Sequence, residues 1–181
     1  MKLKKLALAG VVATSLIGLS FGGTQASAAS NPDLIIINKK YNKMMFLNDG
    51  YVAMTKPVAT GRTWDLTPVG DWKVVQKVKN RPYYKGKIPG GDPRNPLGNR
   101  WLGLNAAGTS GNVYGIHGNN NPSSIGKYAS SGCVRMYDQD VEKLYDYVAV
   151  GTPVKITYSN KSFQDLAKLY KYKIKGWKSI K

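Results

Sequence analysis

The 181-residue chain contains a single cysteine, Cys133, and a single histidine, His117, which lies 16 positions earlier. A thiol attacks carbonyl carbon as the thiolate, and an unperturbed cysteine is only a few per cent ionised near neutral pH. A neighbouring imidazole supplies a base that removes the proton. Because the chain has one residue of each kind, any cysteine–histidine nucleophilic pair in it consists of these two.

The surroundings of the pair favour chemistry over two structural alternatives, a buried inert cysteine and a structural histidine. A lone cysteine cannot form an internal disulfide, so it is inert, bonded to another molecule, or reactive. Gly115, Gly118 and Gly132 flank the pair and allow backbone to approach a substrate closely. The turn at Gly132 and Cys133 is also placed to direct backbone N–H groups at an oxyanion.

A metal or cofactor site is not indicated. Zinc needs at least three protein ligands, normally at close spacing, and the only further candidates near the pair are the carboxylates of Asp138, Asp140 and Glu142. The glycine-rich stretch 86–98 lacks the lysine and hydroxyl spacing of a phosphate-binding loop. We therefore expect no metal and no cofactor.

The segments that carry the pair are predicted to be ordered. A short strand over GNVYGIHG ends at His117, and a polar loop leads to a segment that resumes apolar character at Cys133. A short helix follows, with Asp138 as its N-cap and Gly151 as its end, before a final strand over TPVKITY. Its apolar positions with helical spacing are Val141, Leu144, Tyr145 and Val148.

The first half of the mature chain alternates apolar runs with turn residues. Residues 48–50, Asn-Asp-Gly, predict a hairpin, and a further strand begins near Trp72 after a turn at Pro68 and Gly70. The next regular element starts only at Arg100, because the residues before it are rich in breakers: Gly90, Gly91, Pro93, Pro96 and Gly98.

Residues 1–28 have the pattern of a signal peptide: three lysines, an apolar run from Leu6 to Phe21, and small residues before a mature start at Ala29. The run falls short of the about 20 residues that a membrane span needs. We expect a secreted protein that acts at the cell wall, with no stable membrane span. Residues 29–159 have the size of one catalytic domain, and we expect a monomer.

Residues 160–181 are predicted to form a basic amphipathic helix that Ser162 and Asp165 cap. This tail holds seven lysines and one acid, and the net charge of the chain is +17, or +14 without the three lysines of residues 1–28. An exported basic protein meets anionic wall polymers before nucleic acid, so wall polymers are the expected partners. The alternatives are a tail that only packs on the domain and lysines that only aid solubility.

The segment GIHGNNNPSSIGKYASSGCVRM closely resembles the signature of the L,D-transpeptidases of the YkuD type, a His-Gly followed about a dozen residues later by Ser-x-Gly-Cys-(Val/Ile)-Arg. TPVGDW and NPLGNRWLGL resemble flanking segments of that family. The resemblance spans roughly Leu34 to Tyr158.

The resemblance implies a mainly β fold, a β-sandwich-like catalytic domain with a short helix after the cysteine, to which we add the C-terminal amphipathic helix. It also implies that the enzyme cross-links peptidoglycan. In that family the cysteine attacks the carbonyl before the terminal D-Ala of a tetrapeptide stem, and an amine of another stem takes the thioester to give a 3-3 cross-link. Family members are typically acylated by carbapenems.

Carried over to this chain, the resemblance makes Cys133 a thiolate nucleophile and His117 its base, oriented by the backbone carbonyl of Gly118. The N–H groups of Gly132 and Cys133 are candidates for the oxyanion hole. Arg135 either holds a substrate carboxylate or braces the loop.

One position departs from many members of the family. They have histidine where this chain has Ser131, which we group with Gly132 and Arg135 as a candidate for oxyanion or substrate binding. The departure rules out a second histidine at the site.

Two other functions stay open. Water in place of the amine would make the enzyme an L,D-carboxypeptidase that trims stems. A non-catalytic wall-binding protein would use the basic surface alone. Papain-like amidases are disfavoured, because their cysteine precedes their histidine in the chain.

Overall fold

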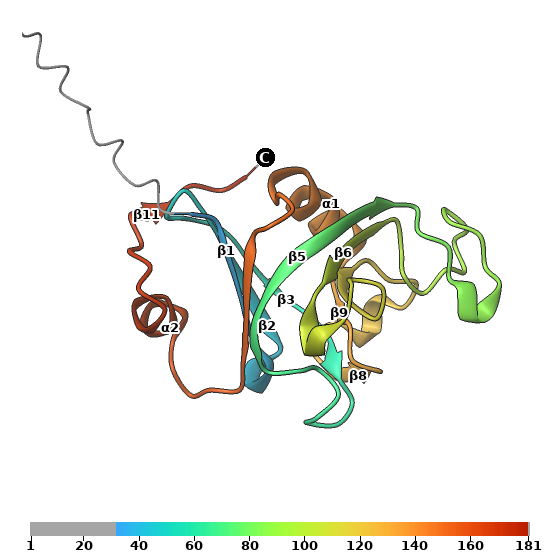
Figure 1. The fold of residues 1–181 in the computed structure, drawn as a ribbon, viewed down its shortest axis with the longest axis horizontal. Coiled ribbons are helices and arrows are strands. Elements are labelled where there is room, and N and C mark those ends of the chain that lie inside the picture. Colours follow the sequence, from blue (N-terminus) through green and yellow to red (C-terminus); the bar gives the residue numbers. More distant parts are fainter. Residues whose placement is uncertain (1–31, 181) are drawn as a thin grey trace, which may run out of the picture.

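The computed structural model describes residues 32–180, so the predicted signal peptide lies outside the described residues. Within the described range, no helix combines the length and apolar character needed to cross a membrane. The described chain forms one large curled sheet, a second small sheet and two α-helices (Figure 1).

The large sheet has nine strands in the order β11-β3-β2-β1-β10-β5-β6-β7-β9, and β4 and β8 form the small sheet. The large sheet comprises β1 (Leu34–Asn38), β2 (Lys43–Asn48), β3 (Tyr51–Pro57), β5 (Gly70–Lys79), β6 (Arg100–Leu104), β7 (Tyr114–His117), β9 (Val134–Arg135), β10 (Pro153–Thr157) and β11 (Gly176–Trp177). The other strands and the α-helices are β4 (Thr60–Gly61), β8 (Tyr128–Ser130), α1 (Asp138–Tyr147) and α2 (Phe163–Leu169), and short 3-10 helices lie at Lys39–Tyr41, Tyr84–Gly86, Ala106–Gly108 and Pro122–Ser124. The mainly β fold class is therefore confirmed.

The core lies on both faces of β1. Ile35 and Ile37 join the main core cluster with residues of β5, β6, β7 and α1, whereas Leu34 and Ile36 join a second cluster with α2. Alternate residues of a strand point to opposite faces, so an unbroken apolar run fits a strand that is covered on both sides. The curled sheet and its two helices thus give the sandwich-like arrangement (Figure 1).

The predicted hairpin is present between β2 and β3. Asn48 pairs with Tyr51, and the two residues between them, Asp49 and Gly50, have φ angles of 47° and 81°. Positive φ at both central residues is the geometry of the turn that matches the twist of antiparallel strands. The Asp-Gly pair therefore sets the register of this part of the sheet.

Helix α1 follows the cysteine segment as predicted, but its predicted N-cap is wrong. The helix begins at Asp138, the capping position is Tyr137, and no side chain caps it. The Asp138 carboxylate instead accepts a hydrogen bond from the N–H of Asn119, 2.9 Å away. A loop from elsewhere in the chain therefore outcompetes the helix end for this acceptor.

The predicted C-terminal helix is present but shorter than 160–181. Ser162 caps α2 through the N–H of Asp165, as predicted. The helix ends at Leu169, because Lys171 adopts a φ of 62° and the N–H of Tyr172 bonds the carbonyl of Ala167. The chain then extends into β11, which pairs in parallel with β3.

Candidate active site

Three strands place three side chains next to each other. The β6–β7 register pairs Trp101 with His117, and the β7–β9 register pairs His117 with Arg135. Directly opposed residues point to the same face of a sheet. The indole and imidazole rings are accordingly stacked, with centroids 5.4 Å apart. We call Trp101, His117 and Arg135 the sheet side of the site.

The imidazole of His117 is held in one orientation. Its Nδ1 lies 2.6 Å from the carbonyl oxygen of Gly118, so Nδ1–H donates and Nε2 is left as the acceptor. His117 is only 3% exposed. The predicted orienting role of the Gly118 carbonyl thus has the geometry that it requires.

The carbonyl of Gly118 is itself fixed by its neighbours. Asn119 donates from its backbone to the Asp138 carboxylate and from its side chain to the carbonyl of Met136, 2.5 Å away. A Cβ atom at position 118 would overlap the Asp138 carboxylate. Glycine is required here by close packing, and the packing holds the carbonyl that orients the imidazole.

The thiol of Cys133 lies between two pockets. The first, of about 180 Å³, is also lined by His117, Ser131 and Arg135. The second, of about 290 Å³, is also lined by Trp101. The thiol donates to the carbonyl of Val113, 3.3 Å from Sγ. The structure therefore brings together the predicted pair in one pocket and opens the thiol to a second pocket.

The irregular connection between β5 and β6, residues 80–99, covers this thiol. Tyr83 and Leu97 line both pockets, and Arg81 lines the second. The Arg81 guanidinium lies over the Trp101 ring, with Cζ 4.1 Å from the centroid. We call Arg81, Tyr83 and Leu97 the loop side of the site.

The electrostatics of the pair favour two neutral partners at rest. Burial lowers the pKa of His117 to about 4, and the positive charges of Arg135 and Arg81 act in the same direction. The backbone carbonyls of Gly118 and Leu97 act in the opposite direction and raise this pKa. Burial raises the pKa of the Cys133 thiol, while the N–H of Gly115 and the two guanidinium groups act in the opposite direction. The predicted resting thiolate is therefore not supported, because burial penalises both charged forms.

Of the two predicted oxyanion donors, one is already in use. The N–H of Gly132 donates to the hydroxyl of Ser130, 3.1 Å away, and that hydroxyl donates to the carbonyl of Cys133, 2.5 Å away. For the N–H of Cys133, the structure shows no acceptor within residues 32–180. Ser130 was not singled out from the sequence, although it is the serine of the Ser-x-Gly-Cys pattern.

Arg135 and Ser131 differ in how they face the pocket. The backbone of Arg135 pairs with Ala59 through two hydrogen bonds of 2.9 Å. Its guanidinium has neither a hydrogen-bond acceptor nor a carboxylate partner among the described residues. Ser131 is exposed at the pocket wall. The backbone thus braces the loop, and the side chain remains available for a ligand.

Trp101 and Arg81 are residues of the site that the sequence analysis missed. The indole N–H donates to the carbonyl of Gly111, 3.0 Å away, and a Cβ atom at Gly115 would meet the indole ring at 2.7 Å. The signal for Trp101 was its position opposite His117, which appears only once the strands are aligned. No sequence pattern around Arg81 indicates that it lies at the site.

Comparison with known proteins agrees with this geometry. Residues 32–156 match the family profile of the YkuD L,D-transpeptidase catalytic domain. YqjB of Bacillus subtilis, a protein named as an L,D-transpeptidase, is 46% identical over 141 residues, covering 78% of this chain and 80% of that protein. YkuD of Bacillus subtilis, named likewise, is 41% identical over 105 residues, or 58% of this chain, which spans about half of that protein (54%).

A solved structure supports the same fold. L,D-transpeptidase 3 from Mycobacterium tuberculosis, in complex with a faropenem-derived adduct, superposes with a TM-score of 0.52 and 21% identity over 69% of this chain and 60% of that chain. The profile match covers more than half of the chain and includes both His117 and Cys133. On these grounds the chain belongs to the YkuD family of L,D-transpeptidase catalytic domains.

Proposed function

We propose that the protein forms 3-3 cross-links in peptidoglycan and that Cys133 carries the acyl group. The thiol attacks the carbonyl between residue three and the terminal D-Ala of a tetrapeptide stem, and the C–N bond breaks to release D-Ala. The observation that supports this most directly is that Cys133 and His117 line one pocket, with Nε2 of the imidazole left as acceptor.

The proton follows a defined route in this proposal. The neutral imidazole takes the thiol proton as sulfur attacks, and the imidazolium gives it to the departing amine. In the second half, the imidazole takes a proton from the attacking amine of another stem and returns one to sulfur. A His117 pKa of about 4 keeps the imidazole neutral and ready to act as base above that pH.

The N–H of Cys133 is the donor best placed for the oxyanion, because that of Gly132 is occupied by Ser130. Backbone N–H groups in a water-poor site stabilise the tetrahedral intermediate without reorganisation. For the substrate carboxylate we propose Arg135, whose unpaired guanidinium offers a bidentate fork in the same pocket.

Two pockets that meet at Cys133 suit a reaction with two substrates. One holds the stem that acylates the thiol, and the other admits the amine that takes the thioester. Water at the second pocket would give L,D-carboxypeptidase activity by the same chemistry. The products, and not the thioester, distinguish these outcomes.

The test is to incubate the protein with tetrapeptide stems and follow stems and intact protein by mass spectrometry. We expect a thioester on Cys133, free D-Ala and dimeric stems, with Cys133→Ala giving none of them. Tripeptide without dimers would establish the carboxypeptidase instead. Activity that survives Cys133→Ala, or no acylation at all, would overturn the proposal.

A β-lactam offers an independent check on the same residue. We propose that carbapenems acylate Cys133, and this is supported by the adduct that faropenem, another β-lactam, leaves in the mycobacterial structure. A carbapenem adduct should appear on the wild type and not on Cys133→Ala. An adduct on both, or on neither, would contradict the assignment.

We also propose that the protein works outside the cytoplasm and contacts anionic wall polymers. Peptidoglycan lies there, and the chain opens with the pattern of a signal peptide. All six lysines of residues 161–178 are exposed. Binding to purified walls should weaken steeply with salt and after removal of anionic polymers. Salt-insensitive binding would exclude this role of the lysines.

A further inference from the structure

An exposed aromatic surface lies on the loop between β4 and β5 and on its neighbours. Of the twelve large hydrophobic side chains exposed in residues 32–180, five gather here, and we call them the aromatic platform: Tyr41, Trp64, Val69, Tyr128 and Tyr158. Trp64 is the most exposed, at 82%. A gathering of this kind on a soluble domain marks an interaction site more often than chance exposure.

Several contacts join these side chains into one surface, and Tyr41 is joined to the others through Lys40, whose ammonium lies 6.0 Å from the Tyr41 ring centroid. Trp64, Val69 and Tyr158 line a pocket of about 340 Å³ above Lys39. The Tyr128 hydroxyl donates to the carbonyl of Lys40, 3.0 Å away, and burial together with the neighbouring Tyr158 hydroxyl raises the pKa of Tyr128.

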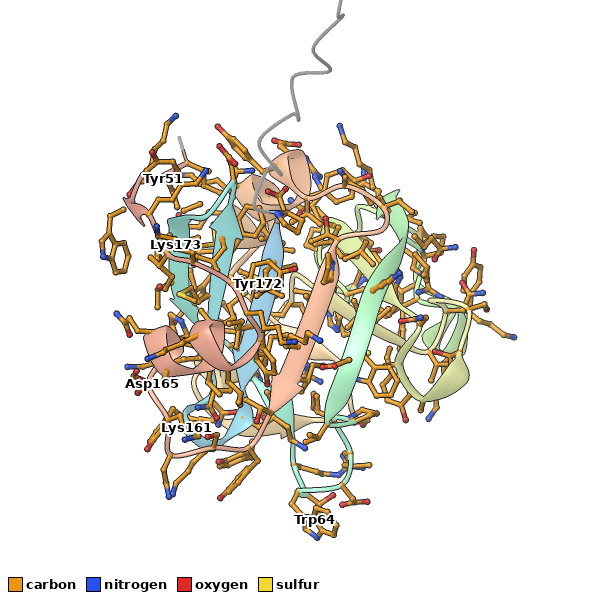
Figure 2. All side chains as sticks on the ribbon, turned by 60° about the vertical axis from the view of Figure 1, so that its left-hand side comes forward. Tyr51, Trp64, Lys161, Asp165, Tyr172 and Lys173 are labelled. Carbon is orange, nitrogen blue, oxygen red and sulfur yellow. The ribbon has the colours of Figure 1, made fainter. Side chains whose placement is uncertain are left out.

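The buried side chain of Lys39 holds the loop that carries Trp64. Lys39 is 1% exposed, and its ammonium donates to the carbonyls of Trp64 and Thr67. Burial lowers the pKa of Lys39, because the charged ammonium is desolvated there. The two hydrogen bonds to the loop carbonyls offset this desolvation and hold the loop. Figure 2 shows Trp64 at the tip of the loop, projecting from the body of the protein. The backbone that carries the exposed indole is thus held in place, which lowers the entropy cost of ordering this loop when a ligand binds.

The same loop is bonded directly to the cysteine segment. The Thr67 hydroxyl donates to the carbonyl of Gly132, 3.0 Å away, and the N–H of Arg62 donates to the carbonyl of Ser130, 2.9 Å away. The loop that carries Trp64 and Val69 is therefore joined by hydrogen bonds to the segment that carries Cys133.

We propose that the aromatic platform binds the N-acetylated glycan strand of peptidoglycan, an inference that rests on the proposed function. Sugar rings have flat C–H faces that pack on aromatic rings by dispersion. Four of the five side chains are aromatic with a polar edge, as an alternating apolar and hydroxylated polymer requires. The linked pair Lys40 and Asn160 adds hydrogen-bonding groups at the rim. Trp and Tyr side chains also lie at lipid headgroups, so binding to a lipid surface is the alternative that the experiment below distinguishes.

The glycan strand is also where the stem peptide is attached. Binding at the platform would raise the local concentration of stems at Cys133 by holding the enzyme on the strand. This predicts that the platform matters for polymeric substrate and not for a free stem.

The first experiment measures binding of the protein to glycan strands stripped of their stems and to an N-acetylglucosamine hexamer. Trp64→Ala and Tyr158→Ala should each weaken binding by about tenfold or more, the effect of losing a central aromatic contact. Trp177→Ala is the matched control, because Trp177 is 68% exposed but lies on β11. It should bind as the wild type does.

Equal binding by Trp64→Ala and the wild type, or no binding of either glycan by the wild type, would overturn the proposal. Loss of binding to anionic lipid vesicles, or of self-association in sedimentation, without loss of glycan binding would overturn it in favour of those partners. Unchanged thermal midpoints would show that the variants fold.

The second experiment separates this proposal from the proposed function. Trp64→Ala should keep its kcat/KM on a soluble tetrapeptide within about twofold and lose about tenfold on intact peptidoglycan. Equal loss on both substrates would overturn the platform as a glycan site. Glycan binding that depends on Trp64 in a protein without transfer activity would support the platform while the proposed function fails.

Discussion

The two sides of the site are held in place by different kinds of backbone structure, paired strands on one side and an irregular loop on the other. The sheet side lies on strands whose backbones pair residue by residue. The imidazole of His117 is held in one orientation by the hydrogen bond of 2.6 Å from its Nδ1 to the carbonyl oxygen of Gly118. The loop side stands on the irregular connection between β5 and β6, which spans residues 80–99. Asn95 holds this connection through side-chain bonds to the carbonyls of Arg81 and Pro89, 2.9 and 3.1 Å away.

This difference predicts that the two sides contribute to different steps, the sheet side to proton transfer and the loop side to substrate binding. Proton transfer needs atoms held within a fraction of an ångström, which strands provide, whereas a wall that admits and releases long stems needs a loop. Substitutions of Trp101 and His117 on the sheet side should therefore change kcat, and those on the loop side should change KM.

His117→Gln should lower kcat by about 10²–10⁴, the usual contribution of a positioned general base. Glutamine keeps a polar group near the Gly118 carbonyl but cannot take the thiol proton. The residual rate should rise with pH, because hydroxide then supplies the thiolate. Acylation by a carbapenem, followed by stopped-flow absorbance, measures this step directly. A variant within threefold of the wild type would remove His117 from the proton route.

Acid should destabilise the fold through the same residue. The pKa of His117 is lowered from 6.5 to about 4 in the folded state, so the unfolded chain binds the proton first as pH falls. Stability from the neutral imidazole is complete above pH 6.5 and is lost progressively toward pH 4, by about 3 kcal/mol. Urea unfolding between pH 7 and pH 4 measures the loss.

The control for this prediction is His117→Gln, which cannot titrate. Its free energy of unfolding should change less between pH 7 and pH 4 than that of the wild type. Parallel pH profiles for the two proteins would show that carboxylates, and not the buried imidazole, cause the acid sensitivity.

The sequence predicted those parts of the molecule that depend on rare residues or local chemistry. Cys133 and His117 were found because each is the only residue of its kind in the chain. The β2–β3 hairpin was found because Asp49 and Gly50 tolerate positive φ, and the cap of α2 because Ser162 meets the N–H of Asp165. In each case the stabilising partner lies within a few residues.

The missed features depend on partners that lie far apart in the chain. Trp101 lies at the site because the strand register places it opposite His117. The Asp138 carboxylate does not cap its own helix, because it accepts a hydrogen bond from the N–H of Asn119. The resting charge of Cys133 depends on burial, which no local pattern reports. The early end of α2 was missed because Lys171 occupies a left-handed position where glycine is usual.

The two arginines near the thiol should differ in strength. Arg135, on the sheet side, lowers the pKa of Cys133 more than Arg81, on the loop side. Arg135→Gln should slow alkylation of the thiol by iodoacetamide at pH 8 by up to about tenfold, one pKa unit of lost thiolate, and Arg81→Gln should slow it less. Arg94→Gln, which removes an exposed arginine paired with Asp92, should leave the rate unchanged. A larger effect at Arg81 would reverse the ranking of the two sides.

The smallest effect should fall on the loop side. Tyr83→Ala removes a wall of both pockets without touching the imidazole, so KM for a tetrapeptide stem should rise about three- to tenfold while kcat stays within about twofold. Tyr147→Ala is the matched control, since Tyr147 is 42% exposed and lines neither pocket, and it should leave both constants unchanged. Steady-state kinetics at saturating acceptor separate the two constants. If kcat fell with KM unchanged, the loop would be positioning the reacting groups, and the contrast between the two sides of the site would not hold.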